Sequence, residues 1–342
     1  MTENEKNTLY NKIDTLNQIL WDNRALRPTI DEWLNNFEEG EEREEALYLL
    51  SKCMYFGHSN IRALLRSLYK DKYRSAVIQE IRAENGGTLD EDFIEAEFRR
   101  RLMNTRFLGV GNPSESGVHL LYYFRQENRI PRKLFINTDE MFASNSDGTI
   151  CLNEDKCKGV DRVVFIDDLC GSGSQVSSNY GVRPCVEKLR ILENHIKVSY
   201  LMMFGTTKGI ENVRNATVKD STEKLFDKVE TVMELNESYK CFSDCSRYFK
   251  ENDAEFKEKT REMALKHGRM LMDKIIDKDY HQKLGEEERN KKIEHRSLGF
   301  GDCQLLLSMQ HNTPNNTLPI LWFDEDDMVW TPIFKRYNKV YL

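Results

Sequence analysis

The chain has 342 residues, of which 39% are hydrophobic and 31% charged, and its formal net charge is -7 at pH 7. This composition is typical of a globular protein with one large domain or two ordinary ones. The negative net charge argues against a protein that binds nucleic acid over its whole surface, although it permits a local basic patch. No apolar run approaches the ~20 residues that span a membrane, and residues 1–6 lack the basic-then-apolar order of a signal peptide. We therefore expect a cytoplasmic protein without a membrane segment.

The first hundred residues are typical of helices. Apolar residues recur at spacings of three and four, beginning with Leu9, Ile13, Leu16 and Leu20, which places them on one helix face. Thr29 and Glu32 have the spacing of a capping box, and an apolar stripe that includes Trp33 follows. The sequence predicts a helical lobe over residues 1–103.

After residue 104 short apolar runs alternate with helical stretches. The predicted strands are 106–110, 134–136, 162–166, 198–204, 229–235 and 303–309, and the predicted helices include 118–128, 184–193 and about 253–277. This alternation favours an α/β domain over residues 104–342, with a parallel sheet covered by helices. We expect a helical insertion at about 245–295 and a C-terminal segment at about 296–342. Ligands of such sheets bind beyond the C-terminal ends of the strands.

The most informative stretch is residues 163–175. Four apolar residues predict a buried strand, and Asp167 and Asp168 stand at its C-terminal end. Backbone N–H groups of small residues can close around a phosphate, and Ser hydroxyls add donors. The order is that of a ribose 5-phosphate site, although an ordinary strand with an Asp-rich turn is the structural alternative. The loop residues are Gly171, Ser172, Gly173, Ser174 and Gln175.

Other nucleotide and catalytic motifs are absent from the sequence. An apolar run ending in two acids also resembles a Walker B strand, but no G-x-x-x-x-G-K-[ST] occurs, and no G-x-G-x-x-G opens a helix. The seven histidines form no metal or triad motif. The closest cysteine pairs, Cys151 with Cys157 and Cys241 with Cys245, lack the common zinc spacing, so we expect free thiols.

Two further loops carry polar residues in unusual density. The loop between the predicted strand 106–110 and the helix 118–128 has donors that would suit an anion, but it also has standard turn residues. Its members are Asn112, Pro113, Ser114, Glu115, Ser116 and Gly117. Near the end of the chain, Asn312, Asn315 and Asn316 offer amide groups to a base or an amide, while an Asn-Pro turn is the alternative.

Residues 163–175 resemble the phosphoribosyl pyrophosphate (PRPP) signature of type I phosphoribosyltransferases. The resemblance implies that Asp167 and Asp168 bind the ribose 2- and 3-hydroxyls and hold Mg²⁺, and that residues 171–175 bind the 5-phosphate. It implies that residues 112–117 take the pyrophosphate and that residues 139–161 form a flap over PRPP, with Lys156 or Lys158 near the leaving group. The asparagines at 312, 315 and 316 would form the hood over the acceptor.

A narrower resemblance rests on four strings, at residues 33–37, 167–175, 242–249 and 312–317. Together they resemble the PRTase-CE group, which comprises phosphoribosyltransferase-like proteins of bacterial conflict and antiphage systems, some encoded beside retron reverse transcriptases. This implies an antiphage effector that acts at ribose C1 of PRPP or of a ribose 5-phosphate nucleotide. A reverse transcriptase–nucleic acid complex would be its partner if it is retron-associated.

The sequence departs from an active purine transferase at one position. Gly171 stands where several such enzymes carry an acid, and no carboxylate follows before Glu187. Two other readings therefore stay open: a module that senses PRPP or a nucleotide without chemistry, and a protein that docks a partner through its helical lobe. Gly181 and Pro184 also predict that the helix after the loop is split.

Overall fold

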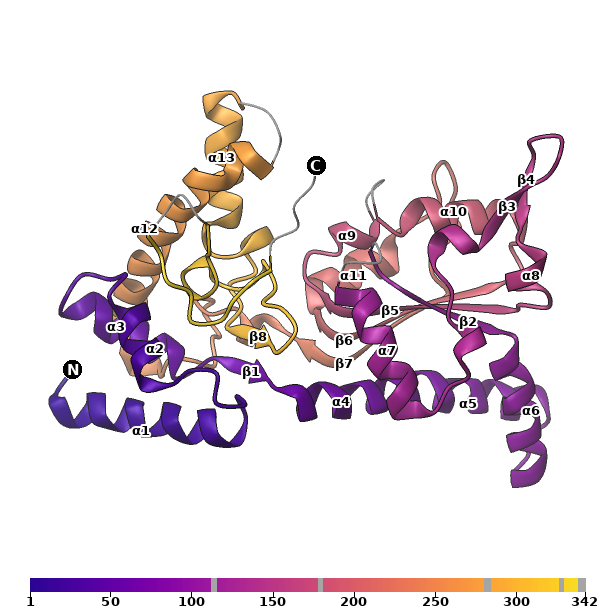
Figure 1. The fold of residues 1–342 in the computed structure, drawn as a ribbon, viewed down its shortest axis with the longest axis horizontal. Helices are drawn as coiled ribbons and strands as arrows, with labels where there is room; N and C mark the ends of the chain where they lie inside the picture. The colour runs from indigo at the N-terminus through magenta and orange to yellow at the C-terminus, as the bar shows by residue number, and fades with distance from the viewer. Residues whose placement is uncertain (112–115, 178–180, 280–283, 326–328, 338–342) are drawn as a thin grey trace. The chain divides into compact units, whose positions relative to one another are not determined.

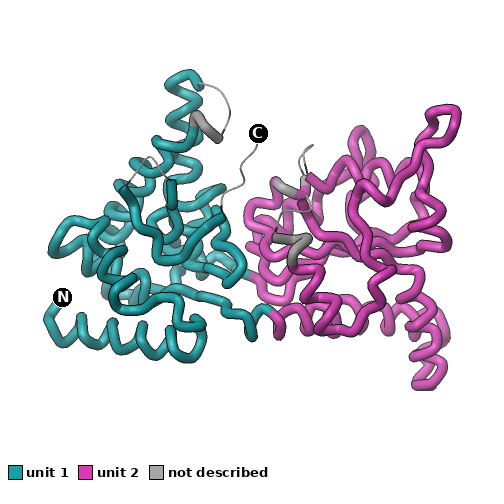
Figure 2. Tube along the Cα trace, in the orientation of Figure 1, with its two compact units in different colours: residues 1–61, 235–342 teal, residues 62–234 magenta. Residues whose placement is uncertain are grey.

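The computed structural model describes residues 1–111, 116–177, 181–279, 284–325 and 329–337. Its chain forms two compact units, residues 1–61 with 235–342 and residues 62–234, which are coloured separately in Figure 2. We call them unit 1 and unit 2 and describe each by itself. Among the described residues, no helix combines the length and the apolarity needed to cross a bilayer.

Unit 2 is built around a four-stranded sheet with the order β2-β5-β6-β7, and Figure 1 labels its strands. Strand β5 runs parallel to both β2 and β6, which confirms the predicted parallel α/β fold. Its residues 163–166 are all buried, because helices cover a parallel sheet on both faces. The strands are β2 (Thr105–Gly109), β5 (Arg162–Cys170), β6 (Lys197–Thr206) and β7 (Lys228–Leu235).

Helices, turns and a hairpin surround this sheet. Helix α7 packs on β2 and β5, and α11 packs on β6. The helices of unit 2 are α5 (Ser75–Glu84), α6 (Glu91–Met103), α7 (Ser116–Asn128), α8 (Glu154–Cys157), α9 (Ser174–Ser177), α10 (Arg183–Leu192) and α11 (Thr207–Asn215), with the π-helix η1 (Leu68–Arg74). Helix α4 (His58–Ser67) leads from unit 1 into unit 2. Strands β3 (Phe142–Ser144) and β4 (Ile150–Leu152) form an antiparallel hairpin, and the predicted split after the loop is confirmed by α9 and α10.

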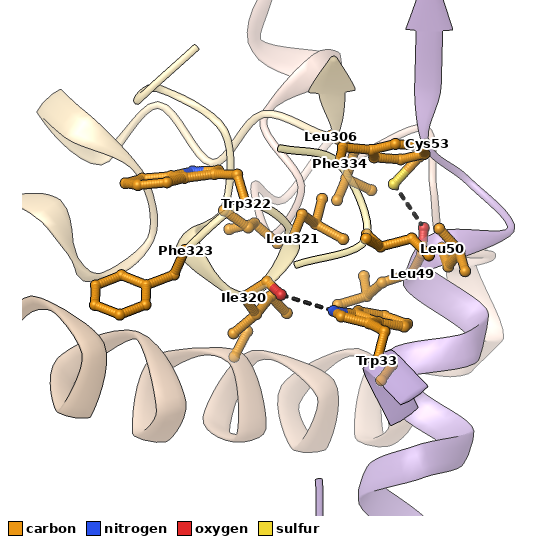
Figure 3. Packing of buried hydrophobic residues seen from close by; sticks show 14 of the residues in the cluster. Trp33, Leu49, Leu50, Cys53, Leu306, Ile320, Leu321, Trp322, Phe323 and Phe334 are labelled. Atoms are coloured by element: carbon orange, nitrogen blue, oxygen red, sulfur yellow. Dashed lines mark hydrogen bonds between the residues drawn. The ribbon is translucent and has the colours of Figure 1, made fainter. Parts of the chain in front are cut away.

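Unit 1 joins the two ends of the chain. Strand β1 (Met54–Phe56) pairs in parallel with β8 (Leu307–Met309). The helices of unit 1 are α1 (Glu3–Ile19), α2 (Arg27–Leu34), α3 (Glu41–Leu50), α12 (Ala254–Asp279) and α13 (Glu286–Ser297). Trp33 is fully buried, and its indole Nε1 donates a hydrogen bond to the carbonyl of Ile320 at 2.8 Å. Figure 3 shows how residues near 50 and near 320 share this core.

Three features differ from the sequence-based expectations. Residues 134–136 form no strand: a 3-10 turn, Arg132–Leu134, is followed by one isolated bridge between Phe107 and Phe135. The run 303–309 yields only β8, which pairs with β1 rather than with the main sheet. The division of the chain also runs differently from the predicted boundary between residues 103 and 104. Tyr73 shows why, because its hydroxyl lies 2.8 Å from the hydroxyl of Thr105 at the start of β2.

Candidate functional site

Strand β5 carries the two predicted acids within the sheet rather than after it. Its pairing with β6 continues past the apolar run, joining Asp167 to Met202 and Cys170 to Gly205. Neighbouring residues of a strand point to opposite faces of the sheet. Asp167 and Asp168 therefore face different surroundings, and they differ in burial.

Asp167 is a buried carboxyl group that the fold itself uses. It is 3% exposed, and its Oδ2 accepts a hydrogen bond from the hydroxyl of Tyr200 at 2.6 Å. Its Oδ1 accepts one from the backbone N–H of Asp168 at 2.9 Å. Burial, together with the neighbouring charge of Asp168, raises the pKa of Asp167 well above its ordinary value, since a desolvated carboxylate is costly. Asp167 is thus held in the interior by the Tyr200 hydroxyl and by the backbone of Asp168.

Asp168 is the acid that solvent can reach. Its side chain is half-buried, and its Oδ1 accepts a hydrogen bond from the backbone N–H of Leu169 at 2.7 Å. It lies three residues before the loop that begins at Gly171. Of the two predicted acids, Asp168 is therefore the one that is open to a ligand, and its ribose-binding role stays a prediction.

The loop after β5 is held from one side by α11. The carbonyl of Gly171 accepts a hydrogen bond from Thr206 Oγ1 at 2.5 Å, and the carbonyl of Ser172 accepts one from Asn212 Nδ2 at 2.9 Å. In a trans peptide the N–H points opposite to the C=O. The backbone N–H groups of Ser172 and Gly173 therefore point away from α11, which is the orientation that an anion-binding loop needs.

Side chains add donors on the loop itself. The hydroxyl oxygens of Ser172 and Ser174 lie 2.8 Å apart, and Ser172 Oγ accepts a hydrogen bond from the N–H of Ser174 at 3.3 Å. Ser174 is exposed and Ser172 is half-buried. Two hydroxyls are thus gathered at the start of α9.

Two glycines allow the close packing of the loop on α11. A Cβ on Gly209 would lie 2.1 Å from the carbonyl oxygen of Gly171, so no side chain fits there. Gly173 has a φ of +78° and would also meet the carbonyl of Gly209 at 2.9 Å. Thr206 caps α11 by accepting from the N–H of Gly209 at 2.9 Å. Glycine at both positions is therefore required by backbone geometry and by space.

Sequence reasoning missed the residues that support this site: Tyr200, Thr206, Gly209 and Asn212. The order Thr206-Thr207-Lys208-Gly209 after a strand predicts the N-terminus of a helix, with a threonine as its N-cap. Nothing in it, however, indicates contact with a loop 35 residues earlier in the chain.

Several predicted site residues lie outside the described residues. Asn112, Pro113, Ser114 and Glu115 are among them, and so are the side chains of Ser116 and Gln175. Gly117 lies in the first turn of α7, and Gln175 lies in α9. Because Gly109 of β2 pairs with Ile166 of β5, the chain leaves β2 at the same edge of the sheet as the acids. The pyrophosphate role of residues 112–117 stays a prediction.

The asparagines predicted as a hood belong to unit 1 and form hydrogen bonds within it. Asn316 Nδ2 donates to the carbonyl of Phe300 at 2.9 Å, and Asn312 Oδ1 accepts from the N–H of Tyr337 at 3.1 Å. The carbonyl of Asn315 accepts from the N–H of Phe300 at 2.7 Å. The side-chain bonds reach residues 16 and 25 positions away in the chain, so they connect the Asn-rich segment to other parts of unit 1. An acceptor-binding role for Asn312, Asn315 and Asn316 stays a prediction.

Binding of Mg²⁺ at this site would depend on the carboxylate of Asp168 and on the phosphate oxygens of a bound substrate. The described part of the chain contains no cluster of three or more His, Cys, Asp or Glu residues that could hold a metal ion, and all eight cysteines are free thiols. Mg²⁺ usually takes one or two carboxylates together with phosphate oxygens of the substrate and water. Asp168 fits that donor set, whereas the buried Asp167 does not.

A parallel sheet whose central strand carries two acids and ends in a Gly-Ser loop backed by a capped helix defines a phosphoribosyltransferase-like α/β protein. The family model PRTase-CE matches residues 30–336, so the chain belongs to the PRTase-CE family. This confirms the resemblance drawn from the sequence and covers both units. No curated protein and no solved structure matches the chain.

Proposed function

We propose that this protein binds PRPP or a ribose 5-phosphate nucleotide and acts at ribose C1 as a phosphoribosyltransferase. The observation that carries the proposal is the loop of residues 171–174. Its carbonyls are tied to Thr206 and Asn212, and its N–H groups at Ser172 and Gly173 point away from α11, directly after the accessible Asp168. Backbone N–H groups arranged in this way suit a phosphate.

Each group of the loop has a defined task in this proposal. The N–H groups of Ser172 and Gly173 and the hydroxyls of Ser172 and Ser174 bind the 5-phosphate. Asp168 accepts a hydrogen bond from a ribose hydroxyl, which fixes the sugar and presents C1 to the acceptor. Magnesium, held by Asp168 and the pyrophosphate oxygens, would neutralise the leaving group. Gly171 supplies no acid, so a proton from the acceptor must go to another group or to water.

A sensing module is the second candidate, and one observation favours it. Asp167 is engaged by Tyr200 in the interior, so one of the two acids that the resemblance assigns to ribose is withdrawn from the ligand. With Gly171 lacking a carboxylate as well, the site keeps its phosphate-binding groups and has fewer groups for chemistry. Binding without turnover is the behaviour that this candidate requires.

We extend the proposal to a biological role in bacterial antiphage defence, as a retron-type effector. The support is the resemblance of the four sequence strings to conflict-system phosphoribosyltransferase-like proteins. In that role the effector would deplete or modify a nucleotide or RNA, and its partner would be a reverse transcriptase–nucleic acid complex. Co-purification of the chain with a reverse transcriptase encoded beside it tests this part.

The activity is tested with the full chain, PRPP and MgCl₂, by measuring pyrophosphate release and, separately, PRPP binding by calorimetry. The variant Asp168→Asn removes one charge and keeps the size of the side chain. It is expected to weaken PRPP binding by about 10- to 100-fold, the range for a lost hydrogen bond to a charged group. Asp92→Asn is the matched control, because Asp92 is an exposed carboxylate in the first turn of α6, and it should bind as the parent does.

The outcomes separate the candidates. Pyrophosphate release that depends on Asp168 supports the transferase, and binding without release supports the sensor. PRPP that fails to bind at millimolar concentration with Mg²⁺ contradicts both. Asp167→Asn should affect PRPP binding less than Asp168→Asn, and the reverse order would contradict the division of roles between the two acids.

A further inference from the structure

Unit 2 contains a large basic cavity that the proposed PRPP site does not use. Its volume is about 1240 Å³. Residues from α6, β2, α7, the 132–137 segment and α8 line it, and Figure 1 labels these helices and the strand. Its lining includes six cationic side chains and two acidic ones, although the whole chain is acidic. The cationic residues are Arg106, Arg125, Arg132, Lys133, Lys156 and Lys158.

The cavity lies toward the opposite end of the strands from the phosphate loop. Arg106 is the second residue of β2 and pairs with Val163 of β5, five residues before Asp168. At ~3.3 Å per residue this separation is about 16 Å along the strand. A ligand in this cavity would therefore bind at a place of its own.

Most of the cations lack an acidic partner. In the part of the chain that the structure describes, Arg106, Arg125, Arg132, Lys133 and Lys158 form no ion pair within 4.0 Å, and only Lys156 does, with Glu140 at 3.0 Å. This leaves positive charge gathered around one open space, which attracts a polyanion.

Arg106 shows how this charge is built into the fold. Its Nε donates to the carbonyl of Lys156 at 2.6 Å, and its Nη1 donates to the carbonyls of Thr105 at 2.9 Å and Met103 at 3.2 Å. Three backbone carbonyls thus fix the guanidinium at the cavity wall. They leave its charge without a carboxylate, so a phosphate would supply the missing counter-charge.

An aromatic platform stands beside the cations. Tyr122 on α7 is 54% exposed, and the guanidinium of Arg125 lies 5.7 Å from the centre of its ring. Gln126 Nε2 donates to the Tyr122 hydroxyl at 2.9 Å, which orients the ring. Exposed aromatic rings among cations are the means by which proteins hold unpaired bases.

We propose that this basic cavity binds single-stranded nucleic acid, with phosphates on the cations and a base on Tyr122. The volume favours a strand over a single nucleotide, since it exceeds the ~300–1,000 Å³ typical of small-ligand pockets. A duplex has its bases paired and stacked, so it cannot place one on the ring.

The test measures binding of a fluorescein-labelled 12-mer of dT to the full chain by fluorescence anisotropy. We assign one phosphate contact to each of the five cations that lack an acidic partner. With about 0.7 per contact, the logarithm of the association constant should fall with log [salt] at a slope of about -3.5. The double variant R132E/K133E reverses two exposed cations. It should weaken binding by roughly 100-fold at 50 mM salt and reduce the slope by about 1.4, because each lost contact removes about 0.7 from the slope.

The matched control is K219E/K224E. Lys219 and Lys224 are exposed cations of the same unit that do not line the cavity, and their reversal changes the net charge equally. The control should bind as the parent does. Tyr122→Ala should weaken binding by about 5- to 100-fold, the range for a lost stacking contact. Tyr122→Phe keeps the ring and should restore most of that affinity.

Four results would each overturn the proposal. The first is that the parent does not bind the 12-mer at 100 μM protein and 50 mM salt, and the second is that the cavity variant and the control lose equal affinity. The third is equal affinity for a duplex of the same length. The fourth is displacement of the 12-mer by inorganic tripolyphosphate at the same phosphate concentration, because phosphates without bases would then account for the binding. Far-ultraviolet circular dichroism of each variant checks that the fold is intact.

Discussion

Gly209 is the position at which the support of the phosphate loop can be tested most directly. In Gly209→Ala the new Cβ would lie 2.1 Å from the carbonyl oxygen of Gly171, about 1.3 Å short of the 3.4 Å at which ordinary contacts begin. Moving the loop by that amount would break the 2.5 Å hydrogen bond between Thr206 and Gly171. The loop and α11 must separate, and the orientation of the loop N–H groups is lost with them.

The energetic terms have opposite signs. Alanine in a helix is favoured over glycine by about 1 kcal/mol. Overpacking costs about 1–3 kcal/mol, and the lost hydrogen bond costs about 0.5–1.5 kcal/mol. We expect Gly209→Ala to lower the stability of unit 2 by about 1–2 kcal/mol, although helix propensity alone predicts a gain.

Hydrogen exchange followed by mass spectrometry localises this effect. Peptides that cover β5 and α11 should exchange about 5- to 30-fold faster in the variant, as a loss of 1–2 kcal/mol implies. Tryptophan fluorescence gives an internal reference, since all four tryptophans lie in residues 1–61 and 235–342 and should report unchanged unfolding of unit 1. Gly285→Ala is the control, because a Cβ there meets no atom within 4 Å. Equal or slower exchange in Gly209→Ala, with PRPP binding unchanged, would refute the close-packing argument.

Three further changes probe the interior. Trp33→Phe removes the donor to the buried carbonyl of Ile320 and should lower the free energy of unfolding by about 1–3 kcal/mol, read from the urea midpoint. Tyr200→Phe should cost a similar amount by circular dichroism, because Asp167 loses its hydroxyl partner. Burial, together with three neighbouring glutamates, raises the pKa of Glu45 to about 7. The unfolded chain therefore loses this proton at lower pH than the folded protein does, and stability falls as pH rises from about 4.5 to 7. Glu45→Gln should therefore add about 2–3 kcal/mol at pH 8 and nothing at pH 4, and an equal gain at both values would contradict the assignment.

The sequence predicted the elements whose signals are local. The apolar run before Asp167 gave β5, and the spacing of Trp33 and its neighbours gave a buried helix face. Gly181 and Pro184 correctly marked the break between α9 and α10. These features follow from periodicity and backbone preference, which a short window of sequence contains.

The remaining features depend on partners far away in the chain. Strand β5 extends to Cys170 because β6 offers matching hydrogen-bond partners, which the polarity of Asp167 and Asp168 conceals. The burial of Asp167 was not predicted either, because it is a polar residue and its hydrogen-bond partner Tyr200 lies 33 residues later in the chain. The apolar residues 303–309 predicted a strand of the main sheet, but apolarity does not determine which strand is the pairing partner. In the structure β8 pairs with β1 instead.

The arrangement of unit 1 has a consequence for biosynthesis. Unit 2 is one continuous segment, so it can fold as soon as residue 234 has left the ribosome, as continuous domains generally do. Residues 1–61 must wait for the last hundred residues, because Trp33 and β1 find their partners at Ile320 and β8. Throughout that interval their apolar side chains stay without their final cover. A chain truncated after residue 234 would therefore keep unit 2 and leave the apolar faces of α1, α2 and α3 uncovered, so the folding of unit 1 depends on the synthesis of residues 235–342.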